Sequence, residues 1–365
     1  MFLLLDREIG IVHNIIYENS EYQEIEAIIG REKSKAISYT CFTGICRVGD
    51  KVLLNTTAIR LGLGTGGFHY VIAILKEDSK IHKKTGHIMK LRYTPLQLAI
   101  QTMEEEESPY HDSIMEFKSL ENLPVISCSL HSMLAPAVAI IKYYLPDIKI
   151  TYIMTDGGSL PISMSNIIRH LKDKKLIDNT ITYGHAFGGD FEAINIYTAL
   201  IGAKEVCKAD LVIVGMGPGI VGSGTKYGFT GLEQGSIIDA INTLGGYSLA
   251  IPRISFADKR KRHYGISHHT ITTFTKVAKT KTTIVFPEIK DKGKMDIIRE
   301  QIIKYKLSDF HNIEYKEVDE LEKVLKYFDI RVSTMGRNYI EDKEFFQAAG
   351  VAGKLVLEKL KEWER

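Results

Sequence analysis

Between Pro124 and Ser267, short apolar runs end again and again in glycine, aspartate or histidine. These runs span residues 124–130, 148–154, 180–183, 209–214 and 248–254. Their length and residue types are typical of buried strands. Helix-like runs separate them, so the alternation predicts right-handed βαβ units and a largely parallel sheet.

Further helix and strand signals extend this pattern to the carboxyl terminus. Helices are expected at residues 133–144, 162–171, 191–206, 232–244, 295–305, 319–328 and 342–362, and one more strand at residues 282–286. About six or seven strands with helices on both faces predict a doubly wound, Rossmann-like α/β domain over residues 124–365.

The first part of the chain has a different pattern. Runs rich in Ile, Val, Tyr and Thr occupy residues 8–17, 21–29, 35–40, 51–57 and 68–75. About five such strands predict a small β-barrel-like domain over residues 1–77, which by strand count resembles an oligonucleotide-binding fold. Residues 78–123 form a connecting segment with a helix from Thr94 to Glu107. With 365 residues and 44% apolar content, the chain is long enough for two domains.

Charge and cysteine content say more about the cellular compartment of the protein than about its function. A net charge of +2, from 47 basic and 45 acidic residues, gives no global attraction to nucleic acid or to an anionic membrane. The four cysteines lack metal-finger spacing and fit free thiols in a reducing compartment. No signal-peptide pattern or bilayer-length apolar run is present. We expect a cytoplasmic protein without a membrane partner, and a homo-oligomer stays open.

Histidine and aspartate side chains follow several of the expected strands. In an open parallel sheet, ligands bind beyond the carboxyl ends of the strands. The candidates for acid–base chemistry are His185, Asp190, Asp156 and His263. A mixed set of imidazoles and carboxylates also suits a divalent metal, for which the candidates are His131, Asp156, His185 and Asp190. The alternative is that Asp156 and Asp190 only cap the helices that follow them.

Glycines cluster beside these side chains. The ligand-binding candidates among them are Gly157, Gly158, Gly188, Gly189, Gly215, Gly217, Gly219 and Gly222. The last three form a G-x-G-x-x-G pattern after a strand, as in dinucleotide-binding units. However, the next helix is expected near Leu232 and Pro218 lacks an amide donor, so a nicotinamide dinucleotide is disfavoured. A loop around an anion or a flat ligand is favoured, and a flexible lid is the alternative.

A basic segment from Arg253 to Thr270 is the densest polar cluster. Its candidates for holding a phosphate or carboxylate group are Asp258, Arg260, Arg262, Ser267, His268 and His269. Arg337, at the end of another expected strand, offers a second anion contact. The alternative is a solvated basic loop without a ligand.

Seven segments taken together resemble a known family. They are residues 54–58, 61–67, 86–97, 154–158, 184–190, 216–222 and 265–270. This family consists of bacterial proteins of unknown function, and the resemblance covers nearly the whole chain. It implies a shared fold and no particular reaction, cofactor or substrate.

The density of reactive groups along one rim favours an enzyme over a pure binding module. The favoured function is acid–base chemistry by histidine and aspartate on a small anionic ligand, phosphorylated or nucleotide-like, by a hydrolase or a transferase. The alternative is a metabolite-sensing or nucleic-acid-associated protein without catalysis, in which the barrel contacts the partner. That alternative rests on the basic and aromatic residues Arg31, Lys33, Lys35, Tyr39 and Arg47.

Overall fold

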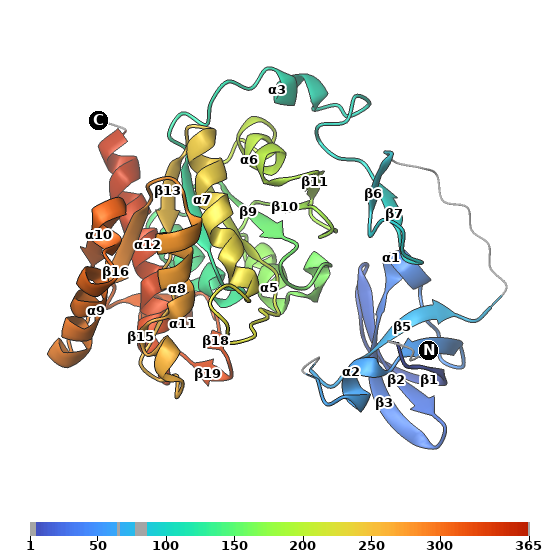
Figure 1. Cartoon of the computed structure of the whole chain (residues 1–365). Helices are drawn as coiled ribbons and strands as arrows, with labels where there is room; N and C mark the ends of the chain where they lie inside the picture. The colour runs from blue at the N-terminus through green and yellow to red at the C-terminus, as the bar shows by residue number, and fades with distance from the viewer. Residues whose placement is uncertain (1–4, 64–65, 77–85, 364–365) are drawn as a thin grey trace. The chain divides into compact units, whose positions relative to one another are not determined.

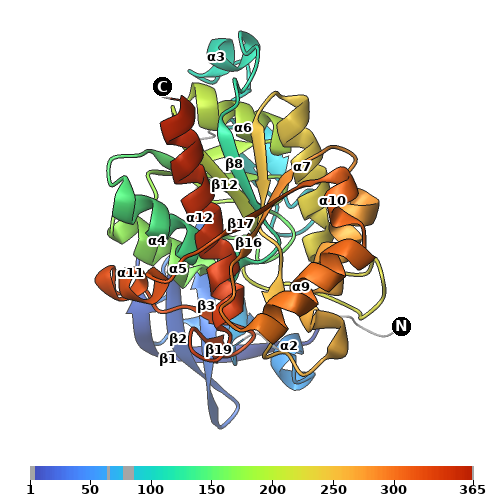
Figure 2. The same cartoon turned by 90° about the vertical axis from the view of Figure 1, so that its left-hand side faces the viewer.

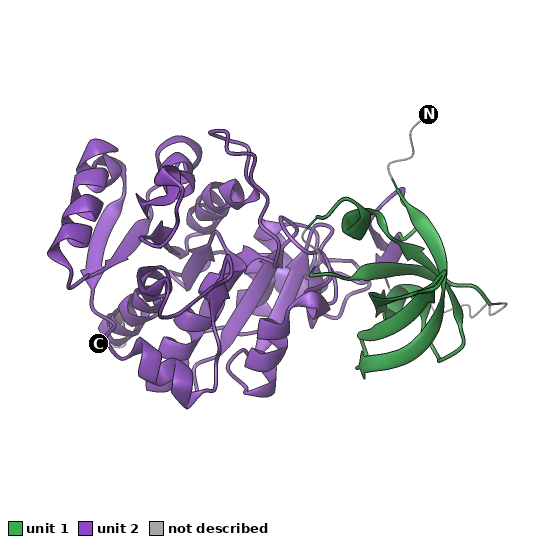
Figure 3. Ribbon diagram, turned by 90° about the horizontal axis from the view of Figure 1, so that it is seen from below, with its two compact units in different colours: residues 1–83, 94–96 green, residues 84–93, 97–365 purple. Residues whose placement is uncertain are grey.

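A computed structural model of the chain describes residues 5–63, 66–76 and 86–363. It divides the chain into two compact units (Figure 3). Unit 1 comprises residues 1–83 and 94–96, and unit 2 comprises residues 84–93 and 97–365. Each unit has its own hydrophobic core.

Unit 1 is a closed five-stranded barrel, as the sequence predicted. Its strands are β1 (Arg7–Glu18), β2 (Tyr22–Ile29), β3 (Glu32–Tyr39), β4 (Lys51–Asn55) and β5 (His69–Ile74), in the order β1-β2-β3-β5-β4. All neighbours are antiparallel except β3 and β5. Alternate residues such as Val52 and Leu54 point inward, which makes the core. Two short helices, α1 (Thr40–Thr43) and α2 (Thr57–Arg60), complete the unit.

The helix predicted from Thr94 to Glu107 is wrong. Strand β7 (Leu98–Ile100) pairs instead with β6 (Ile88–Lys90), and turns follow up to α3 (His111–Met115). The acidic run from Glu104 to Glu107 lies in these turns and not in a helix. The buried carboxylate of Glu105 accepts backbone N–H groups of Thr102, at 2.5 Å, and of His87, at 2.8 Å. These bonds hold the segment in a non-helical path.

Unit 2 contains an eight-stranded sheet in which all neighbours are parallel, so the predicted doubly wound α/β class is confirmed (Figure 1). The strands are β8 (Pro124–Cys128), β9 (Ile150–Thr155), β10 (Asn179–Tyr183), β11 (Phe191–Ala193), β12 (Leu211–Met216), β13 (Tyr247–Ala250), β16 (Thr283–Pro287) and β17 (Asn312–Lys316). Their order is β11-β10-β9-β12-β8-β13-β16-β17. Strands β11 and β17 were not predicted.

Helices cover both faces of this sheet. One face packs mainly against α4 (Leu134–Tyr144), α5 (Asn166–Asp173), α11 (Leu321–Tyr327) and α12 (Lys343–Trp363). The other face packs against α6 (Ile196–Glu205) and α7 (Gln234–Thr243), and α9 (Lys292–Lys304) lies on the same side as α7. Figure 2 shows α12 lying lengthwise against the first face, where it contacts α4 and β16. Successive side chains of a strand enter different clusters, as with Val125 and Ile126 of β8.

The connections place a crevice around β12. Strands β8 and β9 lead into α4 and α5 on one face, whereas β12, which lies between them, leads into α7 on the other face. The chain therefore changes faces on both sides of β12. In sheets of this kind, the carboxyl ends of strands at such a point leave space for a ligand.

Smaller elements complete unit 2. They are β14 (Ile254–Ser255), β15 (Gly265–Ile266), α8 (His268–Thr272), α10 (Leu307–Phe310), β18 (Ser333–Thr334) and β19 (Arg337–Asn338). The strand expected near residue 331 is thus only a two-residue hairpin arm outside the main sheet. Within the described residues, no helix combines the length and the apolar character needed to cross a membrane.

Candidate functional site

A pocket of about 880 Å³ lies at the carboxyl ends of β8, β9 and β12. Its lining comes from four segments, within residues 130–135, 164–170, 217–220 and 329–335. The first three segments follow the strands that flank the change of faces. The pocket thus occupies the crevice that the sheet topology leaves open.

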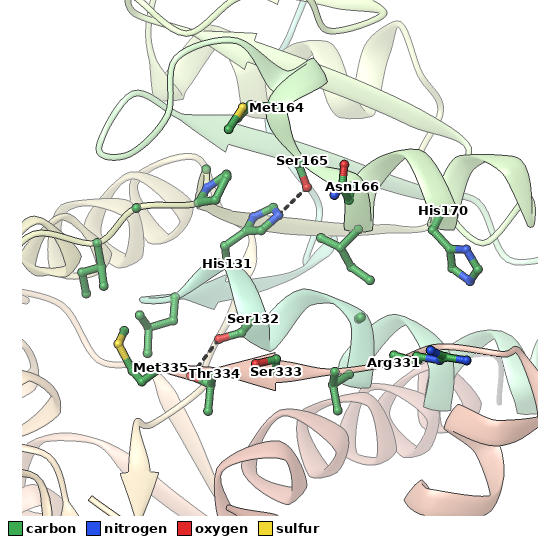
Figure 4. A pocket seen from close by; sticks show the side chains of 18 of the residues that line it. His131, Ser132, Met164, Ser165, Asn166, His170, Arg331, Ser333, Thr334 and Met335 are labelled. Atoms are coloured by element: carbon green, nitrogen blue, oxygen red, sulfur yellow. Dashed lines mark hydrogen bonds between the residues drawn. The ribbon is translucent and has the colours of Figure 1, made fainter. Parts of the chain in front are cut away.

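His131 and Ser165 form a hydrogen-bonded pair in the wall of this pocket. The Ser165 Oγ lies 2.6 Å from Nε2 of His131, and Figure 4 shows the imidazole directed at this hydroxyl. On the other side of the ring, Nδ1 lies 3.1 Å from the carbonyl oxygen of Met216, at the end of β12. A carbonyl only accepts, so Nδ1 carries the proton and Nε2 accepts the Ser165 hydroxyl proton.

The surroundings keep the His131 ring neutral. Burial lowers its pKa to about 4, and the hydrogen bond to Met216 opposes this shift only in part. At neutral pH the ring therefore holds one proton, on Nδ1. A ring in this state can take a further proton on Nε2, which is the atom that faces Ser165.

Ser165 has a structural role as well. It is the N-cap residue of α5, and its Oγ accepts the backbone N–H of Ile168 at 3.1 Å. The hydroxyl thus accepts one hydrogen bond from the helix and donates one to His131. This residue was not predicted from the sequence, because an isolated serine carries no motif. Its one signal was the N-cap pattern at the start of Asn166–Asp173.

Other polar groups line the pocket farther from this pair. The Ser132 hydroxyl donates to Thr334 Oγ1 at 3.2 Å, which joins the β8 end to the segment before β19. Nε2 of His170, on α5, is buried without a hydrogen-bond partner. Arg331 is exposed at the pocket rim, and Figure 4 shows it beyond Ser333.

The glycines after β9 and β12 let two loops meet. A Cβ on Gly158 would lie 2.4 Å from the carbonyl oxygen of Gly217, and a Cβ on Gly217 would lie 2.6 Å from that of Ser159. Across the same contact, the Ser159 N–H donates to the Pro218 carbonyl at 2.7 Å. Gly157 lies against the Glu233 carboxylate. Gly158 and Gly217 therefore shape the pocket wall through loop packing, and Gly157 packs outside that contact.

The other predicted glycines have separate surroundings. Gly189 approaches the β10 backbone so closely that a Cβ would lie 2.9 Å from the Thr182 nitrogen. Gly188 and Gly219 have φ values of +88° and +104°, which favour glycine. Gly215 packs on Cys128. Helix α7 begins at Gln234, after a short turn, so no helix follows Gly222 directly.

The four predicted metal ligands do not converge. His131 uses both ring nitrogens on Met216 and Ser165. Asp156 accepts the backbone N–H of His185 at 3.1 Å, while Nδ1 of His185 accepts the Leu91 N–H at 3.1 Å. Asp190 lies near the amino end of β10, and the predicted site is at the carboxyl ends of the strands.

Asp190 also does not cap a helix, because β11 follows it. Its carboxylate accepts the Thr180 backbone N–H and hydroxyl, both at 2.8 Å, and contacts Lys172 at 2.5 Å. The helix expected from Phe191 begins only at Ile196. Its cap is Asn195, which forms a capping box with Thr198. The hydrogen bonds between Asp190 and Thr180 of β10 explain why the segment after Asp190 is extended.

Two charged groups near the strand ends were not predicted. Lys90 of β6 is 1% exposed, and its Nζ lies 2.5 Å from Glu192 Oε2 and contacts the Ala186 carbonyl. Glu233 receives the Thr155 hydroxyl at 2.5 Å. Burial, together with the charge of Asp156, raises the pKa of Glu233 to about 7. Neither residue could be found by motif, because their burial depends on distant chain segments.

The predicted basic segment is largely paired internally. Arg260 binds the Asp258 carboxylate at 2.9 and 2.7 Å, and Arg337 binds Asp342 at 2.9 Å. The hydrogen bonds from Arg260 lower the pKa of Asp258 well below its usual range. Arg262 remains exposed beside Gly224.

Ser267, in the same predicted segment, is the N-cap of α8, as a helix start there would require. His263, His268 and His269 form a separate cluster beside this network.

Comparison with known proteins gives a family match. A family model described as a protein of unknown function (DUF3866) matches residues 35–353. The matched stretch contains the pocket residues from Leu130 to Met335. No curated protein matches the chain.

Proposed function

We propose a function for this chain, which belongs to the DUF3866 family of proteins of unknown function, as its sequence motifs predicted. The proposed function is that of an enzyme, a hydrolase or transferase, with Ser165 as nucleophile and His131 as general base. Its substrate is a small molecule with a reactive acyl or phosphoryl centre, bound in the pocket beyond β8, β9 and β12. The observation that carries the proposal is the 2.6 Å contact between Ser165 Oγ and Nε2 of His131.

This contact has the geometry of an activated nucleophile. A serine hydroxyl is a weak nucleophile unless an adjacent base takes its proton, and the base in turn needs a third group to orient it. Here the Met216 carbonyl fixes Nδ1 and leaves Nε2 for the hydroxyl. As Oγ attacks, its proton passes to Nε2, and the Met216 carbonyl stabilises the imidazolium that forms. The proton is then available for the leaving group.

The pocket also offers groups for negative charge. The N-terminus of α5 begins at Ser165 and Asn166, and the first backbone N–H groups of a helix lack intrahelical acceptors. Such an N-terminus favours negative charge. Arg331 at the rim adds a cation. These groups favour a substrate with an anionic part, in line with the phosphorylated or nucleotide-like ligand expected from the sequence.

His131 suits the role of base better than His185 or His263. Nδ1 of His185 accepts a backbone N–H, and Nδ1 of His263 bonds Ser267, which lies outside the lining of the pocket. Asp156 and Asp190 are engaged with backbone groups. The proposal therefore assigns the acid–base role to His131, and not to the four residues expected from the sequence.

The test is covalent labelling of the full chain with a fluorophosphonate, read by intact-protein mass spectrometry. Oγ displaces fluoride at phosphorus, so we expect one adduct, and peptide mapping should locate it at Ser165. Ser165→Asn removes the hydroxyl but keeps a good helix cap, and it should abolish labelling. His131→Gln should slow labelling by about 10²–10⁴-fold, the usual contribution of a general base.

Ser132→Ala is the matched control. Ser132 lines the same pocket but bonds Thr334 and not a histidine, so its removal should leave the labelling rate unchanged. Labelling that persists in Ser165→Asn, or a wild-type chain that forms no adduct while folded, would show that Ser165 is only a helix cap.

The alternative without catalysis, nucleic-acid binding by the barrel, has one supporting observation. Arg31 and Lys35 are exposed on or beside β3, and Tyr39 at its end stacks on Tyr70 at 6.2 Å between ring centroids. Basic and aromatic side chains on one strand are typical of single-strand binding surfaces. However, Lys35 stands opposite Glu26, so the positive charge is partly compensated.

A further inference from the structure

Three histidines of unit 2 turn their rings toward one another outside the lining of the pocket. His263 ends a short turn at residues 261–263, and His268 and His269 begin α8. Their ring centroids are 4.9, 5.0 and 4.3 Å apart. One ring nitrogen from each residue lies within 4.8 Å of the other two. We call these three residues the histidine cluster.

Surrounding contacts hold the rings in place. Nδ1 of His263 lies 2.7 Å from Ser267 Oγ, and this hydroxyl also caps α8. Phe229 stacks on the His269 ring at 3.8 Å, with 6° between the planes. His263 and His269 are 2% and 8% exposed. A hydrogen bond on one ring nitrogen, which leaves the other for the metal, is the usual arrangement of a metal-binding histidine.

The cluster has a buried ring nitrogen without a hydrogen-bond partner in the described chain. This nitrogen is Nε2 of His268. Burial, followed by the charges of Arg253 and Arg260, lowers the pKa of His263 to about 3, and burial and Arg253 lower that of His269 to about 3.

The nearby arginines are mostly committed to carboxylates. Arg260 and Arg337 bind Asp258 and Asp342. Arg253 differs, because it donates a long hydrogen bond of 3.3 Å to Nδ1 of His269, and Arg262 is exposed beside Gly224. The other terminal nitrogen of Arg253 lies 3.7 Å from the Asp258 carboxylate. If Nε2 of His269 binds the metal, Nδ1 carries the ring proton and can no longer accept the hydrogen bond from Arg253. The Asp258 carboxylate can then accept a hydrogen bond from Arg253.

We propose that His263, His268 and His269 form a binding site for one divalent transition-metal ion of the zinc type. Three neutral imidazoles are a ligand set that suits Zn²⁺, Co²⁺ and Ni²⁺ better than Mg²⁺ or Ca²⁺. Three protein ligands leave a fourth position open, as in catalytic zinc sites. A Cβ on Gly222 would lie only 3.7 Å from the His269 ring, so the glycine keeps a bulky side chain away from this side.

The other group of potential ligands in the described chain is a weaker candidate. His87, Glu105 and Glu107 also lie within range of one another. However, both carboxylate oxygens of Glu105 already accept backbone N–H groups, and His87 and Glu107 are exposed. The histidine cluster has the unpaired buried nitrogen that this group lacks.

The test is metal binding to the full chain after chelator treatment and dialysis. We expect one Zn²⁺ per chain by native mass spectrometry and a saturable titration, and Co²⁺ should give the visible absorption of a four-coordinate site. His268→Ala should weaken Zn²⁺ binding by more than about 100-fold, since even losing a residue that supports a ligand costs about 10–100-fold. His87→Ala, the matched control, should bind Zn²⁺ as the wild type does.

Folding is checked by the melting temperature of the metal-free variants. Because Nε2 of His268 makes no hydrogen bond, metal-free His268→Ala should melt close to the wild type, and added Zn²⁺ should raise only the wild-type value. His263→Gln provides a second variant with the same expected loss of Zn²⁺ binding. No stoichiometric Zn²⁺ in the folded wild type, or unchanged binding in both cluster variants, would overturn the proposal.

Discussion

Gly158 lies where the backbones of two loops touch at the pocket. Because a Cβ there would lie 2.4 Å from the Gly217 carbonyl oxygen, Gly158→Ala must push two main chains apart. We expect the free energy of unfolding to fall by about 1–3 kcal/mol, as for other overpacked sites. Urea denaturation measures the change.

Gly222→Ala is the control for this prediction. The atoms nearest to its Cβ position are 3.6 Å away or more, which is ordinary contact. Its free energy of unfolding should stay within about 0.5 kcal/mol of the wild type. Equal stabilities of the Gly158 and Gly222 variants would mean that the two loops separate easily.

His131 makes stability depend on pH in a defined direction. Burial lowers its pKa to about 4 in the folded chain, against about 6.5 in an unfolded one. As pH falls below 6.5, the unfolded chain takes up a proton that the folded chain does not, so stability falls by roughly 1.4 kcal/mol per pH unit until about pH 4. Unfolding of the wild type and His131→Gln, compared from pH 7.5 to 4.5, measures this contribution.

The variant should lose less stability than the wild type over that range, because glutamine does not titrate. Two parallel curves would mean that the His131 ring is accessible to protons in the folded chain. The same experiment bears on catalysis, since a ring neutral at pH 7 is the form that accepts the Ser165 proton.

At the scale of elements, the pair Lys90–Glu192 joins the β6–β7 hairpin to β10 and β11. Lys90 Nζ contacts Glu192 at 2.5 Å, and the same carboxylate accepts the Thr182 hydroxyl at 2.6 Å. Lys90→Met would leave a largely buried carboxylate without its cation. We expect a loss of about 3–5 kcal/mol in the free energy of unfolding.

The double variant Lys90→Met/Glu192→Gln is the informative comparison. It removes both charges, so it should recover a large part of the loss seen in Lys90→Met. A double-mutant cycle from urea denaturation gives the coupling energy. If both variants unfold with the same loss, Lys90 acts through packing of its aliphatic chain and not through its charge.

The elements of unit 2 were predictable where local sequence decides them. The runs at 124–130, 148–154 and 209–214 are apolar on both faces, and they form central strands because both faces are buried. Strand β11 was missed because Phe191–Ala193 has a helix-like composition, and Asp190 orders it through Thr180 across the sheet. Local pattern cannot reveal such a partner.

The sequence predicted that the site lies at the carboxyl ends of the strands, but it did not predict which residues form it. His131 stood out because it follows a strand, whereas Ser165 is separated from it by 34 positions and joins it only after folding. Lys90 and Glu233 were missed for the same reason. The glycines were found, but their contacts are between loops, which a sequence motif does not distinguish from contacts to a ligand.

At the scale of the whole molecule, an oligonucleotide-binding assay distinguishes the barrel alternative from the two proposals made for unit 2. Lys33 bonds Glu26 at 3.0 Å and Lys35 stands opposite the same glutamate, so the positive charge on β3 is compensated. We expect the full chain to show no salt-sensitive retention of single-stranded oligonucleotides, even at low salt. Retention that falls as salt rises would instead support nucleic-acid binding by unit 1.

The loop after β12 touches both proposed sites. Its residues 217–220 line the pocket, and Gly222 and Phe229 lie against His269 of the histidine cluster. Two ligands that bias the same loop are thermodynamically linked, and the linkage is reciprocal. Whatever factor Zn²⁺ imposes on affinity for a pocket ligand, that ligand imposes on affinity for Zn²⁺. A metal titration at saturating ligand therefore reports on the pocket without any assay of turnover.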